Sequence, residues 1–121
     1  FALLGPHTGT EDLVRACLAY LTAHGCMVWR NNTGCSYYGK PGQRARLVRF
    51  GPVGGADILG CLPDGRFLAV ECKRGKNVPT YAQETFLQEI CNHGGVAFWV
   101  SSIAELQDRL NAVMVGAGTG K

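Results

Sequence analysis

Two carboxylates and a lysine lie at the ends of two short apolar runs. Asp57 opens the first run, and Glu71 and Lys73 close the second. Between the runs stands Pro63-Asp64-Gly65. This tripeptide favours a tight turn, because proline presets φ, aspartate caps its own turn and glycine tolerates positive φ. We therefore expect the two runs to form an antiparallel hairpin.

The chemistry of this hairpin depends on its register. A turn centred on Asp64 would set Asp57 directly opposite Glu71, with Cβ atoms about 4.5–5.5 Å apart, where like charges destabilise a sheet. Strand side chains alternate between faces, so Lys73 shares the face of Glu71 while Cys72 points the other way. Two acids and one amine on one face suit a divalent cation bound beside an ammonium group.

An exposed hairpin can carry the same charges simply as a salt-bridged, solvated surface. The flanking runs argue against exposure here, because residues 58–62 and 67–70 are nearly all apolar, which is typical of strands covered on both faces. Charges at the ends of such strands are costly unless they are paired or bound to metal. The pattern therefore favours a functional site.

Composition limits the possible classes of protein. The 121 residues are 46% hydrophobic and 17% charged, which predicts one folded domain that is neither disordered nor membrane-spanning. The six cysteines show no C-x-x-C spacing and favour small buried side chains in a reducing compartment over disulfides or a zinc site. With no signal-peptide pattern, we expect a cytoplasmic protein, in a bacterium or a phage-infected host.

Positive charge is concentrated before the hairpin. No acidic residue occurs between Leu13 and Ala56, whereas six basic residues precede Asp57. The segment 31–46 mixes cations, glycines, amides and two tyrosines, which suits a track for a nucleic-acid backbone with aromatic platforms. An ordinary loop with a positive bias is the alternative interpretation of this segment.

Periodicity and capping residues place the hairpin within an α/β chain. We expect helices over about residues 11–24, 80–92 and 102–113, and strands over 26–30, 45–50, the two hairpin runs and 96–100. The order is α-β-β-β-β-α-β-α, and the helical crossover before residue 96 implies a parallel pair within a mixed β-sheet flanked by helices. Residues 1–9 and 114–121 are expected to be flexible ends around a domain of residues 10–113.

The ordered combination of Glu11, Asp57, Glu71-x-Lys73 and Gln83 resembles the PD-(D/E)xK nuclease superfamily. More narrowly, it resembles the VRR-NUC branch, the virus-type replication-repair nucleases. The glycine-rich segment 49–57, which leads to Asp57, and the polar stretch 30–34 after the first strand also resemble that family. One difference is Ala56, which stands where proline often precedes the aspartate. The resemblance covers about residues 10–113 and implies a restriction-endonuclease-like core.

The resemblance implies a metal-dependent hydrolysis of DNA phosphodiester bonds. Asp57, Glu71 and the backbone carbonyl of Cys72 would hold Mg²⁺ or Mn²⁺, with Glu11 acting through water. Lys73 would position and help to deprotonate the attacking water, and Gln83 would hydrogen-bond that water or Lys73. Small members of the family imply a phage-type homodimeric endonuclease selective for branched DNA such as Holliday junctions.

Several of these roles have rival interpretations. Glu11 lies in a first helical turn, where the helix dipole alone favours acids, and Gln83 stands at a capping-box position after Thr80. A non-catalytic nucleic-acid-binding module on the same fold, or a flap or nicking nuclease that depends on partner proteins, is the alternative function. The expected DNA contacts, which could also be solvated loop charges, are Arg30, Asn32, Lys40, Arg44, Arg46, Arg49, Arg74 and Lys76.

Overall fold

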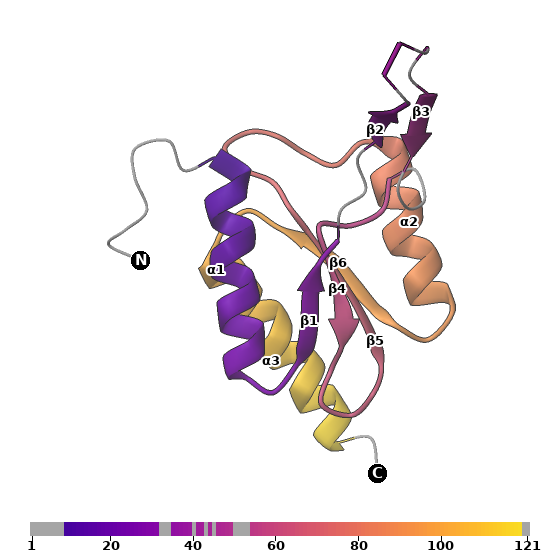
Figure 1. Ribbon diagram of the computed structural model, residues 1–121. Helices are drawn as coiled ribbons and strands as arrows, with labels where there is room; N and C mark the ends of the chain where they lie inside the picture. The colour runs from indigo at the N-terminus through magenta and orange to yellow at the C-terminus, as the bar shows by residue number, and fades with distance from the viewer. Residues whose placement is uncertain are drawn as a thin grey trace.

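The computed structural model describes residues 9–31, 35–39, 41–42, 44, 46–49 and 54–119, with side chains described for 9–31, 39, 41–42, 44 and 54–114. Its elements follow the chain in the order shown in Figure 1. They are α1 (Gly9–Ala23), β1 (Met27–Arg30), β2 (Cys35–Tyr38), β3 (Arg46–Arg49), β4 (Ile58–Cys61), β5 (Phe67–Cys72), α2 (Tyr81–Asn92), β6 (Val96–Val100) and α3 (Ile103–Thr119).

The main sheet is mixed, as the sequence predicted, but it has four strands because the expected strand over residues 45–50 lies outside it as β3. Its order is β1-β4-β5-β6. Strand β4 pairs antiparallel with β1 and β5, while β5 and β6, joined through α2, run parallel. Strands β2 and β3 form a separate antiparallel pair, which projects from the main body near the start of α2 in Figure 1. The chain is therefore a small α/β protein.

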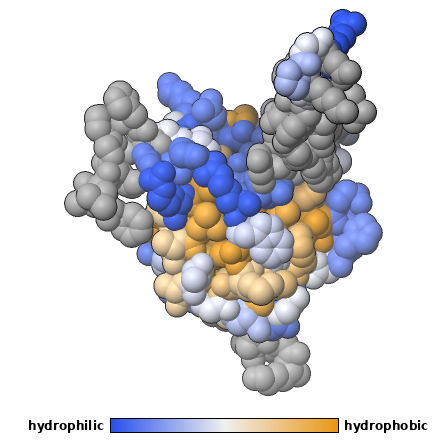
Figure 2. All heavy atoms as spheres, in the orientation of Figure 1, coloured by the Kyte–Doolittle hydropathy of each residue, from blue (hydrophilic) through white to orange (hydrophobic). Residues whose placement is uncertain are grey.

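Helices cover both faces of the main sheet. Helices α1 and α3 pack on one face, where Leu13, Leu106 and Val70 belong to the larger buried cluster. Helix α2 packs on the other face, where Leu87 joins Ala69 in a smaller cluster. Figure 2 shows hydrophobic residues over the middle of the β1 side of the molecule, and hydrophilic residues at the end where α1 begins.

The β4–β5 hairpin has the predicted register. Ile58 pairs with Val70 and Cys61 with Phe67, so opposed residue numbers add to 128 as expected. The turn is closed by a bond from Gly65 N–H to the Leu62 carbonyl, 2.8 Å. Both strands are largely buried, as their apolar runs predicted.

Two details of the predicted secondary structure are wrong: the number of strands and the end of the last helix. Residues 35–38, expected within a loop, form strand β2 and pair with β3, so the order contains five strands before α2 rather than four. Helix α3 was expected to end near Val113 but continues to Thr119. Local sequence was a poor guide to β2, because a short polar strand is stabilised by its pairing partner and not by its own composition.

Among the residues that the structure describes, none of the helices combines the length and the apolar character that a membrane span requires.

Candidate active site

The candidate site is built where β4 begins and β5 ends. Extending the ladder by one residue sets Asp57 beside Glu71. The backbone of Glu71 faces β6, because the neighbouring Lys73 N–H donates to the Val100 carbonyl, 2.9 Å, and alternate residues point the same way. Such a pair is of the non-hydrogen-bonded kind, in which opposed Cα atoms are closest, at about 4.5 Å. The hairpin therefore brings the two acids together.

The Asp57 carboxylate takes the place of a ladder carbonyl. The Cys72 N–H points toward β4 and donates to Asp57 Oδ2, 2.9 Å. The Asp57 N–H in turn donates to Glu71 Oε1, 3.2 Å. These two bonds fix both carboxylates relative to the same two strand ends, so their positions depend on backbone geometry and not on flexible side chains alone.

The Ala56 carbonyl that precedes this pair is held by Asn31. Asn31 Nδ2 donates to the Ala56 oxygen, 3.0 Å, and Asn31 N–H donates to the Asp57 carbonyl, 2.7 Å. Both bonds join the end of β1 to the residues entering β4. Because the Ala56 carbonyl accepts from Asn31, the Cys72 N–H donates to the Asp57 side chain instead. Asn31 therefore positions the Asp57 carboxylate through the backbone.

Glu71 is the buried charge of the site. Its side chain is 3% exposed, and Lys73 Nζ lies 3.3 Å from Glu71 Oε2. Burial first, and repulsion from Asp57 second, raise the pKa of Glu71 to about 7, although Lys73 opposes the change. The Lys73 side chain is 19% exposed, so its ammonium group can reach both the carboxylate and a ligand in solvent.

Cys72 separates the two functional side chains and turns to the opposite face, as predicted. It is buried with α1 residues in the larger cluster. A hydrogen bond with the thiol of Cys17, together with burial, raises the pKa of the Cys72 thiol. The thiol is therefore a protonated core group. Its backbone carbonyl, by strand alternation, faces the same side as the N–H that binds Asp57.

The donor set suits a hard divalent cation. No group of three or more His, Cys, Asp or Glu side chains able to hold a metal occurs among the described residues. Mg²⁺, however, is commonly held by one or two carboxylates together with waters and substrate phosphates. Asp57, Glu71 and the Cys72 carbonyl supply such oxygens, and a cation there would relieve the repulsion that raises the pKa of Glu71.

The structure does not bring Glu11 into contact with this pair. Glu11, on the first turn of α1, forms an ion pair with Arg30 at the end of β1, and both side chains are about half exposed. Arg30 itself pairs with Ile58 across the sheet. The Glu11–Arg30 pair therefore lies at the same end of the sheet as Asp57, and a role for Glu11 through water remains a prediction.

Gln83 is engaged in a capping box at the start of α2. The Thr80 N–H donates to Gln83 Oε1, 2.9 Å, and the Gln83 N–H donates to Thr80 Oγ1, 3.2 Å. This is the structural alternative considered for the residue. Its side-chain oxygen already has a partner, so any catalytic bond would use the remaining amide hydrogens, and its catalytic role also remains a prediction.

The structure describes some of the expected DNA contacts and not others. Arg30, Arg74 and Lys76 stand at the end of the sheet that carries Asp57 and Glu71, and Arg44 is exposed. The backbones of Arg46 and Arg49 lie in β3, but their side chains fall outside the described residues. Asn32 and Lys40 lie outside them entirely.

Gly54 has a structural role that reasoning from the sequence did not single out. Its φ is +80°, and a Cβ there would lie 2.5 Å from the Ala82 carbonyl oxygen in α2. Only glycine allows the chain entering Asp57 to lie this close to the helix. The glycine-rich segment before Asp57 indicated that the backbone there needs glycine, but it did not reveal that the neighbouring group is Ala82 of α2.

Comparison with known proteins adds no relationship to this geometry. No protein-family model matches the chain, and no curated protein matches it.

Proposed function

We propose that the chain is a metal-dependent endonuclease that hydrolyses DNA phosphodiester bonds. The observation that carries the proposal is the juxtaposition of Asp57 and Glu71 at adjacent strand ends, with Lys73 Nζ 3.3 Å from Glu71. We place the chain in the VRR-NUC branch of the PD-(D/E)xK nucleases, with a restriction-endonuclease-like core, because these residues occur in the family's order on an α/β fold.

In this proposal Asp57, Glu71 and the Cys72 carbonyl hold Mg²⁺ or Mn²⁺. When bound, the ion supplies Lewis-acid chemistry, lowering the pKa of a bound water and polarising a phosphoryl oxygen. Lys73 offers its ammonium hydrogens to the phosphate and orients the attacking water. Glu71 holds that ammonium in place, and the Cys72 N–H holds the Asp57 carboxylate.

The proposed substrate is branched DNA, such as a four-way junction. Arg30, Arg74 and Lys76 surround the end of the sheet where the acids meet, and cations there would neutralise backbone phosphates. Changing Lys76 to glutamine should weaken DNA binding and its salt dependence while leaving the rate of the bound complex nearly unchanged, because Lys76 stands on the exposed loop beyond Lys73.

Cleavage assays test this function directly. Purified protein is incubated with end-labelled four-way junction, flap and linear duplex in Mg²⁺, Mn²⁺ or EDTA. We expect metal-dependent cutting that falls roughly 100-fold or more in Glu71→Gln and Lys73→Gln, as for loss of a group that stabilises transition-state charge. Glu89→Gln, at an exposed α2 position, is the control for removal of one carboxylate and should cut normally.

The rival function is a binding module without catalysis. It is favoured by the ion pair of Lys73 with Glu71 and by the capping role of Gln83, which satisfy these groups without a substrate. Binding of junction DNA with no cutting in either metal would favour this module. Cutting that survives both substitutions would instead refute the assignment of Glu71 and Lys73 to the nuclease site.

A further inference from the structure

Tyr81 is an exposed aromatic side chain at the start of α2. It is 86% exposed, more than any other large hydrophobic residue that the structure describes. Val78, in the loop before the helix, is 65% exposed. A ring in this position adds almost nothing to the buried core, so packing does not explain why an aromatic residue stands here.

A contact between α2 and the chain entering the candidate site places Tyr81 near Asp57. A Cβ at Gly54 would lie 2.5 Å from the carbonyl oxygen of Ala82, the residue that follows Tyr81. Gly54 stands three residues before Asp57, and three residues of chain span at most about 11 Å. A DNA strand bound at Asp57 therefore needs only a few further nucleotides to reach the ring of Tyr81.

The loop that joins β5 to α2 brings positive charge toward Tyr81. Residues 73–81 include Lys73, Arg74 and Lys76 and no acidic residue. Figure 1 shows this loop running along the end of the sheet at which β5 finishes, as far as the start of α2. Proteins bind single-stranded nucleic acid with this combination, in which cations contact the phosphates and bases stack on an exposed aromatic ring.

A hollow beside the ring offers room for a base. Its volume is about 330 Å³, and Tyr81, Ala82, Thr85 and Phe86 line the end nearest the start of α2. Among the described residues no cation lines it, so it suits a neutral base better than a phosphate. The remaining lining residue, Glu89, stands eight residues further along the helix, about 12 Å at 1.5 Å per residue. A base stacked on Tyr81 does not reach that carboxylate.

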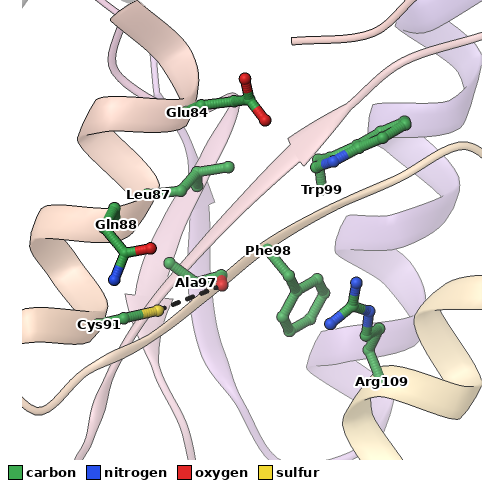
Figure 3. A pocket seen from close by; sticks show the side chains of 8 residues that line it. All are labelled: Glu84, Leu87, Gln88, Cys91, Ala97, Phe98, Trp99 and Arg109. Carbon is green, nitrogen blue, oxygen red and sulfur yellow. Dashed lines mark hydrogen bonds between the residues drawn. The ribbon is translucent and has the colours of Figure 1, made fainter. Parts of the chain in front are cut away.

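The opposite flank of α2 is less suited to nucleic acid. Figure 3 shows the hollow on that flank, about 230 Å³ in volume, with Glu84 on α2 and Arg109 on α3. A second hollow that shares Arg109 is lined by Glu105 and Asp108. The three acids outnumber the one cation and would repel a phosphate backbone. We therefore expect nucleic acid that crosses the start of α2 to follow the flank of Tyr81.

We propose that Tyr81 stacks on an unpaired base of the DNA substrate and so selects branched DNA over continuous duplex. Each base inside a continuous duplex already has neighbours on both faces, and unstacking it costs free energy. A base in a single-stranded arm or at a branch point has a free face for the ring. Tyr81 is in this view a specificity-determining residue that touches the substrate away from the reacting atoms.

The inference rests on the proposed nuclease for the choice of DNA as the ligand, but its test does not need cleavage. Binding is measured in EDTA by fluorescence anisotropy, with the full chain and two DNAs of equal duplex length. One is a blunt duplex, and the other carries a single-stranded arm. We expect Tyr81→Ala to bind the armed duplex roughly fivefold or more weakly, the loss expected for one stacked base, and to bind the blunt duplex as the wild type does.

Two further variants of Tyr81 separate stacking from general apolar contact. Tyr81→Phe keeps the ring and should bind the armed duplex as the wild type does, whereas Tyr81→Leu keeps an apolar side chain without an aromatic face and should resemble Tyr81→Ala. A 2-aminopurine base placed in the arm next to the branch should lose fluorescence with the wild type and Tyr81→Phe only. Lys76→Gln is the contrasting control, because loss of a phosphate contact should weaken binding to both DNAs about equally.

Several results would overturn the stacking proposal. They are unchanged binding and quenching in Tyr81→Ala, an equal loss on both DNAs, wild-type behaviour of Tyr81→Leu, and a wild-type protein that does not prefer the armed duplex. Failure of the proposed nuclease gives a different result. DNA that stays uncut in Mg²⁺ and Mn²⁺, while binding to the arm still depends on the ring of Tyr81, would refute cleavage and support base stacking.

Discussion

Replacing Glu71 by glutamine should change how the stability of this protein depends on pH. Glu71 is 3% exposed and lies between Asp57 and Lys73. Its pKa is raised to about 7 from an ordinary value of 4.5, first by burial and then by Asp57. The folded protein therefore retains this proton over a pH range in which the unfolded chain has already lost it.

The sign and size of the effect follow from linkage. Because the folded pKa is the higher one, the folded state binds more protons between pH 4.5 and about 7, and stability falls as pH rises through that window. A gap from 4.5 to about 7 corresponds to about 3 kcal/mol at pH 8, at about 1.4 kcal/mol per pH unit. Glutamine stays neutral, so the Glu71→Gln variant does not lose this unfolding free energy as pH rises.

Urea unfolding in EDTA at pH 4.5 and pH 8 measures the difference. The free energy of unfolding of Glu71→Gln relative to wild type should increase by about 3 kcal/mol between the two pH values. Glu89→Gln, at an exposed position, should show no comparable change. Adding Mn²⁺ at pH 8 should stabilise the wild type more than the glutamine variant.

A difference that stays constant across this pH range would refute the reasoning, because it would mean that Glu71 is ionised in the folded protein at pH 5. A difference that shrinks as pH rises would refute it more strongly. That result would mean that Lys73 outweighs burial and lowers the pKa of Glu71.

Four further substitutions are informative. Lys73→Gln should reduce single-turnover cleavage roughly 100-fold or more while DNA binding, measured by gel shift, changes little. Asn31→Ala should cost about 1–3 kcal/mol of unfolding free energy, because it leaves the Ala56 carbonyl unpaired. In the same variant kcat should fall more than KM rises; a normal kcat would show that catalysis does not need the bond from Asn31 to Ala56. Gln83→Ala and Thr80→Ala should each lower stability by about 1 kcal/mol, because each removes half of the capping box; a much larger loss of cleavage in Gln83→Ala alone would make Gln83 catalytic. Gly54→Ala should lower both thermal stability and cleavage, because it combines positive φ with a backbone clash; an unchanged melting temperature would contradict this.

The hairpin could be predicted because its determinants are local. The turn residues between two apolar runs set the register, and alternation then assigns Glu71 and Lys73 to one face and Cys72 to the other. The pairing of Ile58 with Val70 and the burial of Cys72 among α1 residues confirm this. Helix α2 was similarly predictable, because Thr80 and Gln83 carry their capping signal within four residues.

Contacts between distant segments were not predictable in the same way. The bond from Asn31 to Ala56 depends on the pairing of β1 with β4, and the strand β2 exists through its pairing with β3. The local amino-acid composition does not indicate which strand β1 or β2 pairs with. The ion pair between Glu11 and Arg30 likewise depends on how α1 packs on the sheet.

The sequence by itself determined which groups could do chemistry and that Asp57, Glu71 and Lys73 would meet, because turn chemistry and a period of two act over a few residues. Only the tertiary structure decided that burial beside Asp57 raises the pKa of Glu71 to about 7, that Asn31 binds the Ala56 carbonyl, and that β6 is an edge strand of the sheet. These properties depend on desolvation and on strand order, which arise only when segments far apart in the chain pack together.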